Sequence, residues 1–465
     1  MIQNKMTPGF KKQRFVHGFF ILACVCLCDG CATLPEVSKV IDETPSNETL
    51  QIASAKRLLS PKQSEDIIRR LKAEAGLTDV LKRQIDVLES ASGVTLKSGN
   101  RVTLLIDGPA TYSAMFEAIK SAKNNINLET FIFSDDDEGK RLADLLLEKQ
   151  ASGVQVNMIY DSVGSLHTSP SFFERMRKGG IHVVEYNPVN LLRVSRTIHR
   201  DHRKVLIIDG SLVITGGVNI SGVYVSSELS GRERNQLEWR DTDIKIEGPA
   251  VANYQAIFLE TWKQQKGPEL PHSGYFPPLK NEGKDLVLVI ANTPGKENRL
   301  TFISYVSAII FANNSVHLTN AYFVPDEQTI SALKGAAKRG VDVKIILPRI
   351  STSSLALYAG HYYYSDLLES GVKLYERQNA TLHAKTGVID GVWSTVGSSN
   401  MDFWSFLMND EINAVILSTE FASEMEKMFD KDISNSDQVK LEKWKQRPLY
   451  PRIRELIAHM FRHWL

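Results

Sequence analysis

One pattern of residues occurs twice in this 465-residue chain, and the two copies are 181 positions apart. In each copy a His is followed by a Lys and an Asp, and then by a Gly and an Asn, all at the same spacing. Chance rarely repeats a string of this length, so the chain contains an internal duplication. The matched residues are His202, Lys204, Asp209, Gly216, Gly217 and Asn219 in the first copy, and His383, Lys385, Asp390, Gly397, Ser398 and Asn400 in the second.

Each copy runs through an apolar stretch, Val205–Ile208 in the first and Thr386–Ile389 in the second. Such a stretch predicts a buried strand with the His and the Lys at its mouth. Two half-sites that each supply an imidazole and an ammonium suit an anionic phosphorus centre. One His attacks the phosphorus atom while the other protonates the leaving group. The alternative is a pair of core strands that happen to carry polar ends.

The other motif residues have expected roles of their own. We expect Lys204 and Lys385 to act as point charges for phosphoryl oxygens as negative charge builds in the transition state. Asn219 and Asn400 can donate amide hydrogens to the same oxygens. A metal ion would be redundant beside two ammonium groups, so we expect neither a metal nor another cofactor.

The motif Asp residues complete the two catalytic strings. Asp209 and Asp390 lie at the far end of each predicted motif strand, away from the His and the Lys. We therefore expect them to have a mainly structural role, such as accepting hydrogen bonds from buried donors.

The length and the formal net charge of +1 describe an ordinary globular protein with room for two domains. This charge balance does not favour or exclude a nucleic-acid or membrane partner. All four cysteines lie near the N-terminus, which excludes a disulfide framework, a thiolate metal site and a cysteine nucleophile in the rest of the chain. They are Cys24, Cys26, Cys28 and Cys31.

Residues 1–31 have the features of a targeting segment. A basic flank precedes the apolar stretch Phe15–Leu27, which is too short to span a membrane comfortably. Gly30 before Cys31 resembles the end of a bacterial lipoprotein signal, and this resemblance implies a lipid-modified Cys31. An uncleaved membrane anchor and a plain signal peptide are the alternatives. We expect a membrane-associated protein, lipid-anchored and facing the periplasm.

Strand and helix patterns alternate after residue 100. The strand pattern Val102–Ile106 and the helix pattern Tyr112–Lys123 begin the series, and Leu286–Ile290 begins it again. This alternation predicts an α/β fold in which helices flank each β-sheet. Two duplicated domains of this kind can place their motifs face to face, so that one shared active site needs both halves.

These patterns divide the chain into segments. We expect a helical lead-in at 32–100, packed on the first domain, which spans 101–265. Prolines at high density make 266–284 a linker. The second domain spans 285–435, and a basic amphipathic tail spans 436–465.

The tail combines basic residues with apolar residues at helical spacing. A basic amphipathic helix with aromatic residues is typical of one that lies on an anionic lipid surface. The alternative is a helix docked on the core of the protein itself. The apolar positions are Ile453, Leu456, Ile457, Met460, Phe461 and Trp464.

Through both strings and the Gly and Asn behind them, residues 100–465 resemble the phospholipase D superfamily, and within it the bacterial cardiolipin synthases. The family is known for two such domains, each with a mixed β-sheet, in one chain. Further similar strings are Ile106–Pro109, Glu129–Phe133, Trp239–Asp243, Ala321–Pro325 and Asn409–Glu411.

The resemblance implies a phosphatidyltransferase that makes cardiolipin from phosphatidylglycerol through a phosphohistidine, on a membrane surface and without nucleic acid. A lipid hydrolase and a nuclease of the same superfamily are the alternatives. The analogy makes His202 the nucleophile and His383 the acid. It also supplies two carboxylates that orient the imidazoles, Asp241 for His202 and Glu411 for His383. Arg200 and Arg203 beside His202 are expected to depress its pKa.

Overall fold

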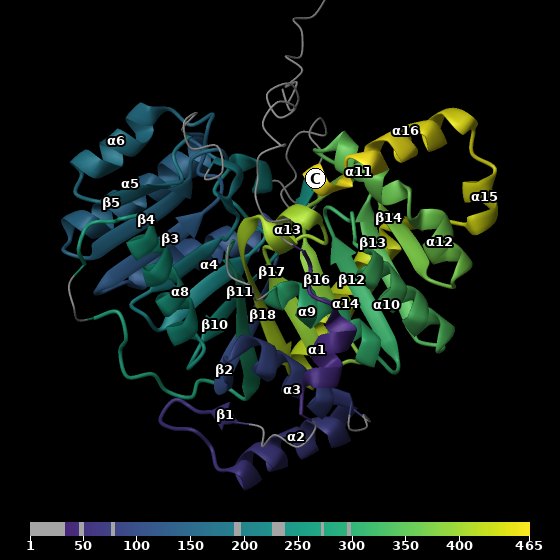
Figure 1. The fold of residues 1–465 in the computed structure, drawn as a ribbon. Coiled ribbons are helices and arrows are strands. Elements are labelled where there is room, and N and C mark those ends of the chain that lie inside the picture. Colours follow the sequence, from purple (N-terminus) through teal and green to yellow (C-terminus); the bar gives the residue numbers. More distant parts are fainter. Residues whose placement is uncertain are drawn as a thin grey trace, which may run out of the picture.

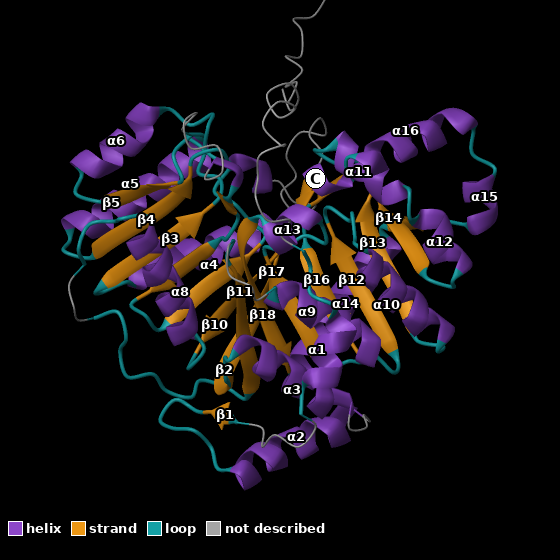
Figure 2. Cartoon of the chain, in the orientation of Figure 1, coloured by secondary structure: helices purple, strands orange, loops and turns teal. Residues whose placement is uncertain are grey.

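The computed structural model describes residues 33–45, 51–75, 80–189, 197–225, 238–270, 274–294 and 299–465. Two α/β halves stand side by side in it, and their strands form one continuous sheet with helices on both faces (Figures 1 and 2). The predicted α/β class with two similar halves is confirmed. The expected targeting segment, including Cys31, lies outside the described residues.

The first half follows the predicted alternation of strands and helices. Its sheet runs in the order β5-β4-β3-β7-β8-β10-β2, with β3, β4 and β5 parallel and the remaining pairs antiparallel. The strands are β2 (Leu96–Ile106), β3 (Asn125–Thr130), β4 (Gln155–Asp161), β5 (His182–Tyr186), β7 (Val205–Ile208), β8 (Leu212–Gly216) and β10 (Thr242–Glu247). The helices are α4 (Asp107–Ser121), α5 (Asp137–Ala151), α6 (Pro170–Lys178) and α8 (Val251–Gln264).

The second half repeats the same order as β14-β13-β12-β16-β17-β18-β11, and β11 pairs with β2 where the halves meet. The strands are β11 (Asp285–Asn292), β12 (Ser315–Asn320), β13 (Asp342–Pro348), β14 (Lys373–Arg377), β16 (Lys385–Ile389), β17 (Trp393–Gly397) and β18 (Asn409–Leu417). The helices are α9 (Leu300–Phe311), α10 (Glu327–Lys338), α11 (Ser354–His361), α12 (Tyr364–Glu369), α13 (Phe403–Leu407) and α14 (Thr419–Ser434).

Short elements complete the fold, and three of them, β6, β9 and β15, take part in strand pairs that cross the boundary between the halves. They are β6 (Arg200–Asp201), η2 (Gly222–Tyr224), β9 (Glu238–Arg240), β15 (Ala380–Leu382) and β19 (Ser436–Gln438). The Pro-rich segment 266–284 lies between α8 and β11, and its Tyr275 is buried against the first half, where its hydroxyl accepts a hydrogen bond from Asn157.

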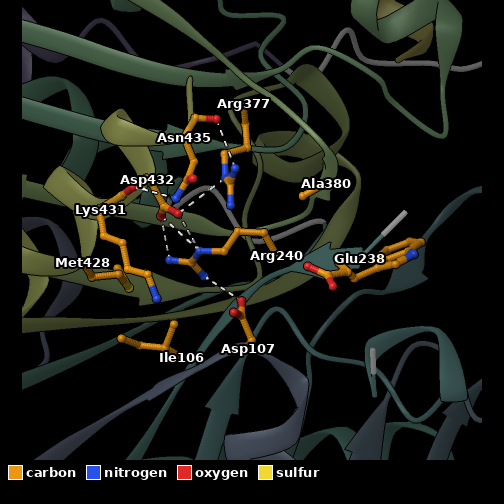
Figure 3. Close-up of a pocket in the computed structure, with 11 residues that line it drawn as sticks. Ile106, Asp107, Glu238, Arg240, Arg377, Ala380, Met428, Lys431, Asp432 and Asn435 are labelled. Atoms are coloured by element: carbon orange, nitrogen blue, oxygen red, sulfur yellow. Dashed lines mark hydrogen bonds and ion pairs between the residues drawn. The ribbon is translucent and has the colours of Figure 1, made fainter. Parts of the chain in front are cut away.

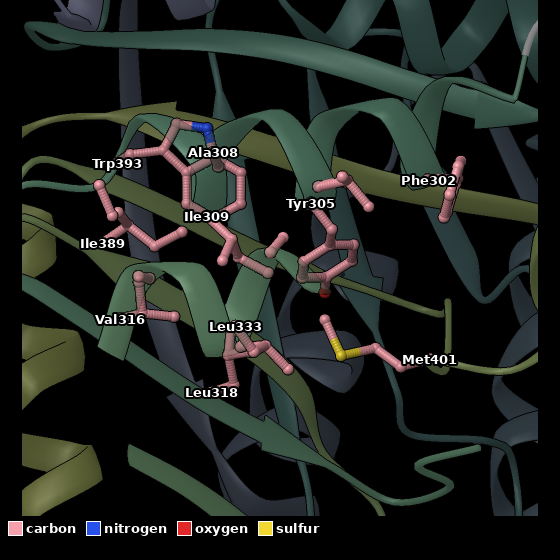
Figure 4. Close-up of a cluster of buried hydrophobic side chains, with 14 of the residues drawn as sticks. Phe302, Tyr305, Ala308, Ile309, Val316, Leu318, Leu333, Ile389, Trp393 and Met401 are labelled. Carbon is pink, nitrogen blue, oxygen red and sulfur yellow. The ribbon is translucent and has the colours of Figure 1, made fainter. Parts of the chain in front are cut away.

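The lead-in comprises α1 (Val37–Glu43), β1 (Ile52–Ala53), α2 (Pro61–Ala75) and α3 (Val80–Ser92). Its expected packing on the first domain is wrong, because its buried residues join the apolar core of the second half. The reason lies in α9, whose side chains are buried almost all round and which therefore needs cover on the side away from the sheet (Figure 4). The backbone amide of Val37 also donates to Gln328 of α10.

The tail forms α15 (Leu441–Lys445), α16 (Leu449–Met460) and η3 (Arg462–Trp464). It is docked on the second half through buried Trp444 and Ala458, of which Ala458 packs with Ala356 and Ala359 of α11. Docking does not use the predicted apolar face, because Leu456, Ile457 and Met460 remain exposed. The docked contacts agree with a helix packed on the protein's own core, and the lipid-surface interpretation of the exposed face stays a prediction.

Candidate active site

Backbone pairing between the halves positions the two motif histidines. His202 lies between β6 and β7, and β6 runs parallel to the start of β18 from the other half. The His202 amide donates to the carbonyl of Asp410 at 2.9 Å. In the same way β15 runs parallel to β9, and the His383 amide donates to the carbonyl of Arg240 at 2.8 Å. Each His is thus held by the strand that comes from the opposite half.

Each imidazole is also bound by a carboxylate from the opposite half. His202 Nδ1 lies 3.0 Å from Glu411 Oε1, and His383 Nδ1 lies 2.8 Å from Asp241 Oδ2. The expected assignment of Asp241 to His202 and Glu411 to His383 is therefore wrong. Each carboxylate adjoins the strand that pairs with the other half, and a sequence of two like halves does not reveal this crossing.

Both carboxylates are completely buried, yet they remain ionised. Burial raises the pKa of each, but the adjacent His383, which donates a hydrogen bond, and the charge of Lys385 outweigh it and hold the pKa of Asp241 below its usual value. His202 and Lys204 do the same for the pKa of Glu411.

The carboxylates fix the tautomer of each imidazole. A carboxylate at Nδ1 selects the form with hydrogen on Nδ1, which leaves the lone pair of Nε2 free to attack or to take a proton. Burial lowers the pKa of His202, and burial together with the charge of Lys385 lowers the pKa of His383 to about 4. Both rings are therefore neutral at pH 7 before substrate binds.

The two motif lysines lie with the histidines. Each ammonium donates to the carbonyl of its own motif His, Lys204 to His202 and Lys385 to His383. Burial lowers the pKa of Lys204 to about 7 and that of Lys385 to about 8. Because an anion beside a buried amine favours its protonated form, a bound phosphodiester would restore their charge.

The expected effect of Arg200 and Arg203 on the pKa of His202 is not found. Arg200 is buried against Asp161, and Arg203 is buried against Glu129 and Asp410. Their charges are thus taken up by carboxylates, and His202 owes its lowered pKa to burial and Lys204 instead. Two further basic residues that precede Arg200 in the sequence, Arg193 and Arg196, lie outside the described residues.

The motif amides occupy different positions in the two halves. Asn219 accepts a hydrogen bond from the amide of Ile132 and donates to the hydroxyl of Tyr224 at 2.9 Å. Asn400 is buried, and its Oδ1 has no hydrogen-bond partner among the residues that the structure describes. Both side chains follow the second strand of their motif hairpin, β8 for Asn219 and β17 for Asn400.

The motif aspartates lie at the opposite end of their strands. Asp209 and Asp390 have φ of 51° and 53°, and each is followed by a Gly with positive φ in the tight turn of a hairpin. Asx-Gly is the pair that such turns prefer. Each carboxylate also accepts three backbone amides, those of residues 123–125 for Asp209 and 313–315 for Asp390. These contacts serve the fold.

Sequence reasoning did not identify several residues of the site. Ser398 donates its hydroxyl to Glu411, whereas a Cβ on Gly217, the matched residue, would meet Asp241. In the sequence, the difference between Gly217 and Ser398 at the matched motif position was the feature that could have indicated these contacts. No spacing indicated the aromatic rings around the histidines. Phe131 lies 5.1 Å from the His202 ring, and Tyr224, Trp239 and Tyr322 lie 5.8, 5.4 and 6.5 Å from the His383 ring.

A pocket beside β9 is separate from the motif histidines, but one of its lining residues, Arg240, stabilises the strand next to them. The guanidinium of Arg240 spans the pocket between Asp432 and Asp107, as Figure 3 shows. The adjoining residue is Asp241, so this ion-paired arginine braces the strand that carries the carboxylate of His383. Neither His nor either Lys of the motifs lines the pocket.

Comparison with known proteins gives the geometry a family context. The family model described as "Cardiolipin synthase, PLD-like domain" matches residues 115–262 and 305–433. A cardiolipin synthase of Geobacillus sp. (strain WCH70) is 35% identical over 79% of this chain and 73% of its own length. Cardiolipin synthase 2 of Bacillus anthracis is 32% identical over 85% and 76%. The solved phosphatidylserine synthase of Haemophilus influenzae has a similar fold, with a TM-score of 0.60 and 14% identity over 77% of this chain and 92% of its own.

The crossed pairing predicts where each carboxylate variant acts. Asp241→Asn removes the charged acceptor at His383, so the Nδ1–H signal of His383 should shift while that of His202 stays in place. Glu411→Gln should give the reverse result. Nuclear magnetic resonance of protein labelled with ¹⁵N-histidine measures both signals, and the Asp209→Asn variant is the control. A shift confined to the His of the same half would contradict the crossing.

Proposed function

Because this chain belongs to the cardiolipin synthase family of phospholipase D-like enzymes, we propose that it joins two phosphatidylglycerol molecules into cardiolipin through a phosphohistidine on His202. One observation carries this proposal. Two buried imidazoles, each bound by a buried carboxylate of the opposite half, lie beside two buried lysine side chains. Such a site matches a reaction that needs one nucleophile, one proton carrier and fixed charges for phosphoryl oxygens.

In the first step of the proposed reaction, Nε2 of His202 attacks the phosphorus atom of phosphatidylglycerol. The bond between phosphorus and the glycerol oxygen breaks, and His383 supplies the proton that the departing glycerol takes up. His383 is neutral before substrate binds, so this role requires the phosphodiester anion to raise its pKa and the ring to take up a proton from solvent as substrate binds. Lys204 and Lys385 stabilise the charge on the non-bridging oxygens.

In the second step, the terminal hydroxyl of another phosphatidylglycerol enters where glycerol left. His383 now accepts the proton of that hydroxyl, and the oxygen attacks the phosphorus atom. The bond from phosphorus to His202 breaks, which releases cardiolipin and leaves His202 neutral and His383 protonated, as they were when the first attack began. The sum is two phosphatidylglycerol molecules converted into one cardiolipin and one glycerol. Asn219 and Asn400 are the proposed amide donors to the phosphoryl oxygens.

We also propose that the enzyme works at a membrane surface, to which a lipid on Cys31 attaches it on the periplasmic side. The sequence supports this proposal through the basic flank, the short apolar stretch and the small residue before Cys31. Among the helices that the structure describes, none is long and apolar enough to cross a bilayer.

The products test the reaction itself. Purified protein with vesicles of radiolabelled phosphatidylglycerol should release cardiolipin and free glycerol in equal amounts, because each transfer frees one glycerol. Thin-layer chromatography of the lipids and an enzymatic glycerol assay measure the two products. Phosphatidic acid in place of cardiolipin would make the protein a lipid hydrolase instead.

Trapping distinguishes the two histidines. His383→Asn lacks the proton carrier, so a substrate with a good leaving group should still load the phosphatidyl group onto His202 and then release it slowly. His202→Asn should form no adduct. Rapid quenching followed by peptide mass spectrometry locates the adduct, and Asp209→Asn is a control that retains the site. An adduct on His383 in the His202→Asn variant would reverse the proposed roles.

The attachment residue has its own test. If Cys31 carries the lipid, Cys31→Ser should abolish labelling by radioactive palmitate in bacterial cells. Cys28→Ser, which changes a neighbouring thiol, should leave labelling intact. Equal labelling of both variants would remove the proposal of an acylated Cys31.

A further inference from the structure

We propose that the enzyme docks on an anionic phospholipid bilayer through an apolar rim that both halves build around the mouth of the site. This inference rests on the proposed function, because it concerns how a lipid substrate reaches the histidines. We use "catalytic rim" for one set of exposed apolar residues. It consists of Val163, Leu166, Val189, Val223, Ile350, Leu355, Leu449, Tyr450, Ile453, Leu456, Ile457, Met460 and Phe461.

Helix α16 supplies the largest part of the catalytic rim. It packs on α11 through Ala458, and its buried Glu455 forms an ion pair with Arg447. The apolar side of the helix faces away from this contact, with Leu449 70% and Met460 68% exposed. A helix that turns its polar residue inward and its apolar residues outward has the opposite of the usual arrangement in a soluble domain. Such a face is typical of an interaction surface.

The rest of the catalytic rim lies in loops and at short helices, with Val223 in η2 and Leu355 in α11. Val163 and Leu166 follow β4, Val189 follows β5, and Ile350 and Leu355 follow β13. Because β3, β4 and β5 are parallel, as are β12, β13 and β14, the carboxyl ends of these strands meet at a common edge in each half.

The histidines lie at this same edge. The carboxyl end of β3 is aligned with the start of β7, directly after Lys204, and the end of β12 is paired with Lys385. Figure 1 shows α11, α13 and α16 together beyond the ends of the second half's strands. The loops of the first half and α16 of the second half therefore lie at the edge of the sheet that carries both motif histidines.

The position of these residues is not a random scatter over the surface. Large apolar side chains are normally exposed singly and need no explanation. Among the described residues, the exposed ones outside the catalytic rim are Leu58, Ile106, Phe276 and Tyr362, and Tyr362 stacks on His459 beside the rim. The concentration around the site thus indicates a surface with a partner.

Charge indicates which partner. The face of α16 is flanked by Arg452, Arg454 and Arg462, while the acidic residue of the helix, Glu455, is already neutralised by Arg447. Each such cation near an anionic bilayer contributes about 1 kcal/mol of attraction. A second copy of the chain would instead bring like charges together. An anionic bilayer also contains the proposed substrate, whose acyl chains can stay in the membrane while its phosphate enters the site.

The experiment uses the full chain with Cys31→Ser, so that no acyl group contributes to binding. Leu166→Glu in the first half and Leu456→Glu in the second should each weaken binding to phosphatidylglycerol vesicles by about tenfold. The matched control Phe276→Glu makes the same kind of change outside the catalytic rim and should leave binding within about twofold. Sedimentation with vesicles measures binding, and circular dichroism checks folding.

Three outcomes separate the possibilities. Both variants should keep their activity on short-chain phosphatidylglycerol dispersed as monomers, since neither residue is part of the catalytic machinery. Unchanged vesicle binding in both variants would overturn the docking surface, and so would a dimer of the Cys31→Ser chain that dissociates in both variants. If the Cys31→Ser chain binds vesicles through the catalytic rim but forms no cardiolipin from either substrate, the proposed reaction fails while the surface stands.

Discussion

The pair of crossed contacts between imidazole and carboxylate is the interaction on which the rest of this structure depends. Glu411 binds His202, and Asp241 binds His383, so neither half contains a complete pair of imidazole and carboxylate. The parallel strand pairs β6–β18 and β15–β9 hold the halves in the register that these contacts need. Docking of the halves and assembly of the site are therefore the same event, and the position of one half directly sets the chemistry of the other.

Burial shifts the pKa values of these groups, and the buried charges need ion-pair partners to be stable. A buried carboxylate without a partner is strongly destabilising, and here each catalytic carboxylate has an imidazole and a nearby ammonium. Beneath each pair lies a buried arginine with carboxylate partners. Arg203 binds Asp410 in the second half, and Arg240 binds Asp432. These two ion pairs also join the first half to the second. The residues of the site are therefore supported by buried ion pairs across the interface between the halves.

Much of the fold was predictable from the repeated string, because a buried strand with a polar mouth must recur wherever His202 and His383 recur. The binding of each histidine by a carboxylate of the opposite half was not predictable. Each half contains one motif histidine and one such carboxylate, so the sequence allows either pairing, and only the order of the strands decides between them. The lead-in was assigned to the wrong half because its neighbour in sequence is β2, whereas its neighbour in space is the fully buried α9. The arginines beside His202 were misread because their carboxylate partners come from distant segments.

The symmetric sheet order has a consequence for assembly. Since the carboxylate bound to each motif histidine comes from the opposite half, the first half of one molecule could pair with the second half of another and build the same site twice. Pairing within one chain is favoured because the segment 266–284 joins the two halves. A short linker of this kind gives one half an effective concentration of about millimolar around the other. Tyr275, buried against the first half, shortens the free part of that tether. The linker therefore determines whether the protein closes on itself or exchanges halves with a neighbour.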